Sequence, residues 1–267
     1  MRHPFFALPT PLVIGHRGSS GEAPENTLPA FARALAQGAV ILETDVHATR
    51  DGVVVVYHDE RVERTTDGAG AIAELDFTAL RALDAGHRYS PDGGRSFPFR
   101  GQGLRIATFA EALAAFPGAR FNVELKRDDA ALVEGTLDAV AAAGRAELTL
   151  LTAGDDAAMA RLSRRLEETG LAPARGASTG DVLGFVRAAL GGGEPPRGPM
   201  ALQIPAEFGG RPLVTRELVS FAHEHDVQVH VWTVNDPAEM HRLLDLEVDG
   251  LVSDYPSRVC EVVASRR

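Results

Sequence analysis

The chain has 267 residues, of which 45% are hydrophobic and 24% are charged, as in an ordinary globular protein with a sizeable core. This length suits a single barrel-type α/β domain covering residues 1–267. The formal net charge of −10 argues against nucleic acid as a partner, so a negatively charged substrate would need a local positive site from an arginine or a metal ion. The single cysteine, Cys260, excludes an internal disulfide and a zinc–thiolate cluster.

The N-terminal stretch predicts a cytoplasmic protein. Prolines interrupt its apolar residues before they reach the length of a signal peptide. No other run reaches the roughly 18 apolar residues that a membrane span needs. We therefore expect no stable membrane insertion, and either a monomer or a homodimer.

The chain alternates between short β-branched runs and helical stretches rich in alanine and leucine. We expect strands at residues 12–16, 40–46, 120–125, 148–152, 172–176, 201–204, 228–233 and 250–253. We expect helices at residues 28–37, 109–116, 130–143, 157–169, 181–189, 216–225, 237–244 and 257–264. This repetition predicts an α/β fold, the parallel (β/α)8 or TIM barrel. A doubly wound open sheet is the competing topology, and the lack of a dinucleotide motif after the first strand disfavours it.

Two segments interrupt this alternation. Residues 47–59 read as a hairpin, because Asp51-Gly52 is a strong turn signal and four valines follow it. Residues 60–106 form a long glycine-containing insert after this second strand and its hairpin. An insert after a barrel strand lies at the C-terminal face, over the active site.

The conspicuous polar residues fall at the C-terminal ends of the predicted strands, where barrel enzymes carry their catalytic groups. They are His16, Arg17, Glu43, Asp45, His58, Glu124, Lys126, Trp232 and Asp254. Because side chains alternate along a strand, Glu43 and Asp45 share one face, and so do Glu124 and Lys126.

Three carboxylates, Glu43, Asp45 and Glu124, are therefore expected to converge at the barrel mouth. Like charges so close repel unless a proton or a cation intervenes, and an all-oxygen set suits one hard divalent ion, Mg²⁺ or Ca²⁺. The alternative is that these carboxylates are solvated, or paired with Lys126 and Arg17.

Two histidines, His16 and His58, are expected beside this cluster. Imidazoles titrate near neutral pH, so the pair can supply one acid and one base. His47 shares the parity of Asp45 and is a weaker candidate for the rim of the site. Arg17 provides a planar, permanently charged group suited to a phosphate, and it precedes a turn that leads into a helix N-terminus. Together these groups point to hydrolysis or transfer of a phosphate ester.

The chain resembles the glycerophosphodiester phosphodiesterase family, a group of (β/α)8 barrels distantly akin to phosphatidylinositol-specific phospholipases C. The matching stretches are "HRGSSGEAPENT", "ILETDVHATRDGVVVVYHDERVERTT", "NVELK", "VWTVND" and "VDGLVSDYP". They occur in order and cover nearly the whole chain. The last stretch has Ser253 where a threonine would be expected, an exchange that keeps the hydroxyl.

The resemblance implies a role for each matching position. It implies acid–base catalysis by His16 and His58, phosphate binding by Arg17 and Lys126, and metal binding by Glu43, Asp45 and Glu124. It further implies that Trp232 lines the alcohol side of the substrate, that Glu25 and Asn26 help to order the site, and that the insert helps to select the head group.

The expected reaction is hydrolysis of a glycerophosphodiester to glycerol 3-phosphate and an alcohol such as choline or ethanolamine. The nucleophile, either water or the adjacent glycerol hydroxyl, and the division of acid and base between the histidines stay open. The alternatives are a lysophospholipase D-type reaction on lysophospholipids and a non-catalytic barrel that binds glycerophosphodiesters.

Two further motifs are disfavoured. "GASTG" places Ser178 in a G-x-S-x-G pattern, but no histidine and acid stand out to complete a triad. "GAGAIA" at residues 68–73 resembles a dinucleotide-binding turn, but it does not follow a predicted strand.

Overall fold

The computed structural model describes residues 3–266, and it contains a ring of eight parallel strands. In ring order they are β6 (Ala174–Arg175), β5 (Thr149–Thr152), β4 (Arg120–Leu125), β2 (Ile41–Ala48), β1 (Leu12–Gly15), β11 (Gly250–Ser253), β10 (Gln228–Trp232) and β7 (Ala201–Pro205). No strand ladder joins β6 to β7 within the described residues, although the Met200 N–H donates to the Arg175 carbonyl oxygen across this seam. The predicted barrel is confirmed, as a nearly closed ring.

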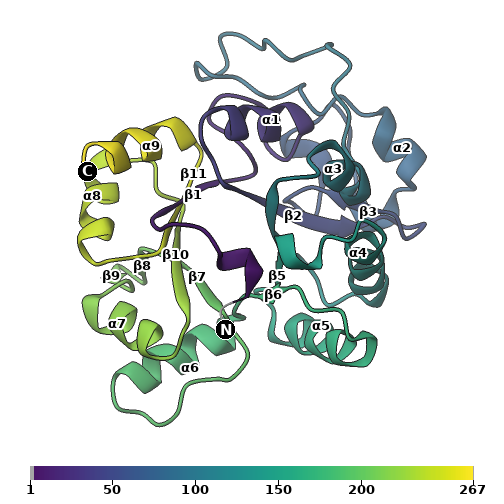
Figure 1. Ribbon diagram of the computed structural model, residues 1–267. Helices are drawn as coiled ribbons and strands as arrows, with labels where there is room; N and C mark the ends of the chain where they lie inside the picture. The colour runs from purple at the N-terminus through teal and green to yellow at the C-terminus, as the bar shows by residue number, and fades with distance from the viewer. Residues whose placement is uncertain (1–2, 267) are drawn as a thin grey trace.

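Helices surround the ring, as Figure 1 shows. They are α1 (Leu28–Ala36), α3 (Phe109–Ala115), α4 (Ala130–Ala142), α5 (Asp156–Thr169), α6 (Thr179–Ala189), α7 (Arg216–Glu224), α8 (Pro237–Asp245) and α9 (Pro256–Ala264). Most begin at a Ser, Thr or Asp whose side chain accepts a backbone N–H of the first turn, as Thr27 does for α1 and Thr108 for α3. Their apolar faces pack on the outside of the strands in one continuous core.

The inside of the barrel is mostly apolar at one end and charged at the other. At the N-terminal end, Phe5 and Phe6 of the short helix η1 (Pro4–Phe6) pack with inward-facing Leu12, Ile14 and Ile41. The buried Gln228 and His230 of β10 are polar residues in this half of the ring, and the His230 ring lies against Phe6. The charged side chains gather at the opposite end, where the strands terminate.

The insert forms a small unit with its own core. It follows β3 (Val54–Val56), which pairs antiparallel with β2 as the hairpin prediction requires. The insert contains η2 (Val62–Arg64), η3 (Ile72–Glu74) and α2 (Phe77–Ala82). These helices pack around buried side chains of the insert and of the hairpin that precedes it. Its Tyr89 hydroxyl donates to the Gly21 carbonyl oxygen, so the insert lies against the loop between β1 and α1.

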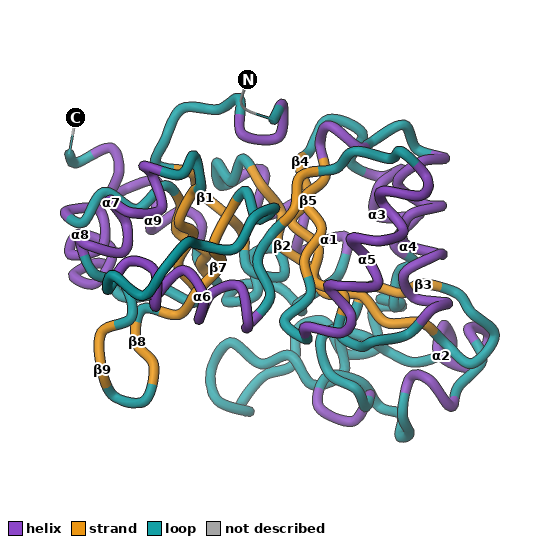
Figure 2. The backbone as a smooth tube through the Cα atoms, turned by 90° about the horizontal axis from the view of Figure 1, so that it is seen from below, coloured by secondary structure: helices purple, strands orange, loops and turns teal. Residues whose placement is uncertain are grey.

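Several short elements were not expected from the sequence. They are α2, the short helices η1, η2, η3 and η4 (Ala146–Leu148), and a hairpin of β8 (Glu207–Phe208) and β9 (Arg211–Pro212). The hairpin and the insert project on the side of the molecule opposite the N-terminus, as Figure 2 shows. Among residues 3–266, no helix combines the length and the apolar character needed to cross a bilayer.

Candidate active site

A cavity of about 210 Å³ opens at the C-terminal ends of the strands. Its walls combine charged, amide and apolar side chains from β2, β4, β5, β7, β10 and β11 and from the segments that follow β1, β3 and β4. They are His16, Arg17, Glu43, Asp45, His58, Asn122, Glu124, Lys126, Thr152, Gln203, Trp232 and Val252. All eight residues predicted for catalysis, substrate binding and metal binding therefore face one cavity.

His16 follows β1, and a carboxylate fixes its ring. Its Nδ1 lies 2.6 Å from Oδ1 of Asp254, which follows β11, the strand paired with β1. Ser20 and Asn235 also donate to this carboxylate. Burial acts to raise the pKa of Asp254, but the hydrogen bonds from His16 and Ser20 prevail and lower it to about 2. Because Asp254 is therefore ionised at neutral pH, it accepts from His16 Nδ1–H and leaves Nε2 for a substrate.

His58 is held in the same way from the other side of the cavity. Its Nδ1 lies 2.6 Å from Oδ1 of Asp59. Burial opposes ionisation of Asp59, but bonds from Arg64 and His58 prevail and lower its pKa to about 2. The two imidazoles thus share one arrangement, a proton on Nδ1 and a free Nε2.

Arg17 occupies a strained position in the turn after β1. Its φ of 52° lies in the left-handed region, which few side chains adopt. Gly18 follows at φ +86°, and a Cβ there would lie 2.6 Å from the Ala30 backbone, so only glycine fits. The guanidinium donates to Glu25 at 2.9 Å and lies 3.4 Å from Asp45, an arrangement that directs a fixed positive charge at the cavity.

The carboxylates at the cavity floor surround the Lys126 ammonium group. Lys126 Nζ lies 3.3 Å from Asp45 Oδ1 and 3.2 Å from Glu124 Oε2. Glu43 accepts the Arg17 backbone N–H at 2.9 Å. Loss of solvation, followed by repulsion from Asp45, raises the pKa of Glu43 to about 7. Glu43 and Asp45 therefore repel each other at the cavity floor.

These residues fit a divalent cation by their chemistry. In the described part of the chain, no three or more carboxylates, imidazoles or thiols gather closely enough to form a ligand cluster. The Lys126 ammonium group nevertheless lies between Asp45 and Glu124, and Glu43 is a poorly solvated carboxylate that Asp45 repels. Oxygen ligands that repel one another suit a hard cation such as Mg²⁺ or Ca²⁺.

The two predicted supporting residues connect the turn after β1 to the floor. Asn26, with φ 56°, donates to Asp45 Oδ2 at 3.0 Å and accepts from the Thr44 hydroxyl at 2.8 Å. Glu25 accepts from Arg17. Asn26 thereby fixes Asp45, while Glu25 fixes Arg17.

Trp232 lines the cavity with 44% of its surface exposed, an apolar wall open to solvent. His47, the weaker candidate, is buried and its Nε2 lies 3.0 Å from the His58 carbonyl oxygen, so it supports the backbone at His58.

Several site residues escaped the sequence analysis. The sequence analysis did not predict that Asn122, Thr152 and Gln203 line the cavity. It also did not predict that Asp254 bonds His16, that Asp59 bonds His58, or that Arg64 bonds Asp59. Strand parity identifies Asn122, which lies two residues before Glu124 on β4. Gln203, Asp254 and Arg64 reach the site through tertiary contacts that no local pattern reveals.

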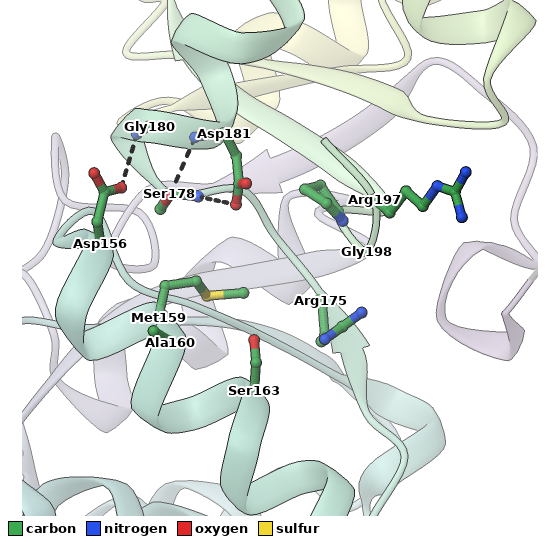
Figure 3. A pocket seen from close by; sticks show the side chains of 11 residues that line it. Asp156, Met159, Ala160, Ser163, Arg175, Ser178, Gly180, Asp181, Arg197 and Gly198 are labelled. Carbon is green, nitrogen blue, oxygen red and sulfur yellow. Dashed lines mark hydrogen bonds between the residues drawn. The ribbon is translucent and has the colours of Figure 1, made fainter. Parts of the chain in front are cut away.

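A second cavity, of about 310 Å³, lies outside the barrel between α5 and α6 (Figure 3). Ser178 lies in its wall, where its side chain accepts the Asp181 N–H and the Asp181 carboxylate accepts the Ser178 N–H. This capping box begins α6, and no histidine is among the described residues that line the cavity. The serine is therefore a helix cap and not a nucleophile.

Fold and site together define a (β/α)8 barrel with two carboxylate-bound imidazoles and an arginine at its C-terminal face. A sequence profile described as the glycerophosphoryl diester phosphodiesterase family matches residues 16–258. The chain belongs to this family, and the expected class of enzyme, a phosphoric diester hydrolase, is confirmed.

Relatives of similar length support this assignment. The chain is 31% identical over 261 residues to a Mycobacterium tuberculosis protein named probable glycerophosphodiester phosphodiesterase 2. This alignment covers 96% of this chain and 91% of the relative. It is 30% identical to the glycerophosphodiester phosphodiesterase of Caldanaerobacter subterraneus, over 94% of this chain and 97% of the relative. A solved Oleispira antarctica phosphodiesterase, in complex with the product sn-glycerol-3-phosphate, superposes with a TM-score of 0.73 at 28% identity, over 95% of this chain and 97% of that one.

Proposed function

We propose that this protein hydrolyses soluble glycerophosphodiesters to glycerol 3-phosphate and an alcohol, with one divalent cation, Mg²⁺ or Ca²⁺, and with His16 and His58 as the acid–base pair. One observation carries the proposal: each histidine is held through Nδ1 by a carboxylate at 2.6 Å, and both line the cavity that contains Arg17 and Lys126. Such a pair can transfer one proton on each side of a phosphorus atom.

In this proposal the charged side chains, the histidines and Trp232 have separate roles. Arg17 and Lys126 bind the non-bridging oxygens of the phosphodiester and offset the charge that develops on them. One histidine removes the proton of the nucleophile through Nε2, and the other donates a proton to the departing alcohol oxygen. Trp232 borders the leaving alcohol.

Glu43, Asp45 and Glu124 would hold the divalent cation. When bound, the cation would neutralise charge on the phosphoryl oxygens and relieve the repulsion between these carboxylates. In the described arrangement the Lys126 ammonium group lies between Asp45 and Glu124, where it offsets part of their charge.

The decisive experiment measures glycerol 3-phosphate release from glycerophosphocholine and glycerophosphoethanolamine after chelator treatment, with Mg²⁺ or Ca²⁺ then restored separately. Turnover that depends on the returned ion supports the proposal and ranks the head groups. Turnover unaffected by chelation removes the metal from the proposal.

Turnover only of lysophosphatidylcholine would identify a lysophospholipase D-type enzyme, and ligand binding without any turnover would identify a binding barrel. The predicted cytoplasmic location is a separate matter that cell fractionation checks.

A further inference from the structure

Arg64, the last residue of η2 in the insert, bonds two carboxylates at once. Its Nη1 and Nη2 donate to Glu25 at 2.7 and 2.6 Å. Its Nε and Nη2 donate to Asp59 at 2.5 and 3.1 Å. The guanidinium thus forms two hydrogen bonds with each of two carboxylates, Glu25 and Asp59, which lie 34 residues apart in the sequence.

Each of these carboxylates also bonds a residue of the site. Glu25 Oε1 accepts from Arg17 Nη1 at 2.9 Å, and Asp59 Oδ1 accepts from His58 Nδ1 at 2.6 Å. The five side chains form one continuous chain of charge-assisted hydrogen bonds, Arg17–Glu25–Arg64–Asp59–His58. It joins the turn after β1 to the segment after β3, which otherwise reach the cavity from separate loops.

The turn that carries Arg64 is firmly anchored. Val62 is fully buried, and its carbonyl oxygen accepts the Tyr57 hydroxyl at 3.0 Å and the Thr66 hydroxyl at 2.8 Å. The Val62 N–H donates to the Gly70 carbonyl oxygen. Arg64 therefore extends from a fixed base, although 47% of its side chain is exposed.

We propose that Arg64 is a positioning residue for the hydrolysis proposed above, on which this inference rests: it sets the distance and orientation of the His58 imidazole relative to the Arg17 guanidinium. Without it, Glu25 and Asp59 would face each other as like charges, and each would be free to turn away with its partner. A planar guanidinium provides the four donors in one rigid group, whereas a lysine ammonium cannot match two carboxylates in this way.

The test compares Arg64→Lys and Arg64→Ala with the unaltered protein, with glycerophosphocholine as substrate. Misplacing a catalytic group by about 1 Å reduces rates by up to roughly 100-fold, so we expect kcat to fall about 10- to 100-fold in both variants. Guanidinium chloride at tens of millimolar, roughly a hundredfold below denaturing concentrations, should restore a large part of kcat in Arg64→Ala. It should not restore Arg64→Lys, whose side chain fills the space.

Arg61→Lys is the matched control, because Arg61 precedes the same short helix and forms an exposed ion pair with Glu63, outside the Arg17–His58 chain of hydrogen bonds. It should keep kcat within about twofold. Variants of Arg64 with kcat within threefold of the unaltered protein, or a loss that guanidinium does not relieve in Arg64→Ala, would overturn the assignment.

A proton NMR measurement separates this inference from the proposed function. The His58 Nδ1–H proton, identified by its disappearance in His58→Ala, should give a protected downfield resonance that survives in Arg61→Lys and is lost in Arg64→Ala. If the protein turns over no glycerophosphodiester, the proposed function fails, while this resonance still decides whether Arg64 orders His58. Its persistence in Arg64→Ala would contradict the positioning role.

Discussion

His16 and His58 depend on acidic neighbours that differ in origin. Asp59 is adjacent to His58 in the sequence, whereas Asp254 comes from the last strand of the barrel. Both carboxylates hold the proton on Nδ1 and present Nε2 to the same cavity.

Replacing either His16 or His58 by alanine should lower kcat by roughly two to four orders of magnitude, because each substitution removes the group that transfers one proton in the transition state. Steady-state kinetics on glycerophosphocholine, with circular dichroism to confirm folding, measures this. His47→Ala serves as a comparison, because its Nε2 contacts the His58 carbonyl oxygen and not the cavity, and a smaller loss is expected. Near-full activity in both His16→Ala and His58→Ala would refute the acid–base pair.

The Asp254–His16 pair should also make stability depend on pH. The pKa of Asp254 is lowered to about 2 despite burial, so its contribution is present above its unfolded pKa near 4 and is lost as pH falls toward 2. The pKa of His16 is raised, because the Asp254 hydrogen bond and Glu43 outweigh its burial, so its contribution is present below about 6.5 and is lost as pH rises through the folded pKa. The pair therefore stabilises most between about pH 4 and 6.5.

Asp254→Asn should accordingly lower the free energy of unfolding by up to about 2 kcal/mol at pH 5, and by less at pH 3 and pH 8. Urea unfolding at the three pH values measures the difference. Asp128→Asn is the control, because its partner Arg161 is exposed and such pairs contribute little. A loss independent of pH would show that the pair contributes through packing and not through charge.

At the scale of the elements, caps decide where the helices begin. Ser178 and Asp181 bond each other's backbone N–H groups at the start of α6. The helices expected from alanine- and leucine-rich stretches agree with the observed ones within a few residues, and α6 begins two residues earlier than expected, at Thr179, because Ser178 caps it. The sequence analysis did not predict the helix α2 or the β8–β9 hairpin, because each is short and depends on packing or a tight turn for its stability.

Ser178→Ala should lower the free energy of unfolding by about 1 kcal/mol, the usual effect of losing an N-cap hydroxyl, while kcat stays unchanged. Denaturant unfolding and activity assays on the same preparation measure both. A loss of activity larger than about threefold would instead return Ser178 to consideration as a nucleophile.

At the scale of the whole molecule, the ring is weakest between β6 and β7. β6 has only two residues, and β7 is paired on its other side with β10 over five residues. The link between α6 and β7, residues 190–200, is largely exposed. Local stability should therefore be lowest along this seam, which lies across the ring from β1 and β2.

Hydrogen–deuterium exchange followed by mass spectrometry should show faster exchange in residues 172–176 and 190–200 than in β1 and β2. The central strands β1 and β2 are the internal reference, because each is paired on both sides. Equal protection of the seam and these strands would mean that β6 and β7 pair more completely in solution.

Much of the molecule was predictable from the sequence by itself. Alternating strands and helices determined the barrel, and polar residues at the strand ends determined which side chains meet, because parallel strands all end at one face. Side-chain parity placed Glu43 with Asp45 and Glu124 with Lys126. The tertiary structure alone decided what holds these groups: Asp254 beneath His16, Gln203 opposite Asn122, and Arg64 between Glu25 and Asp59. These contacts join segments up to 238 residues apart, and no local periodicity encodes such a distance.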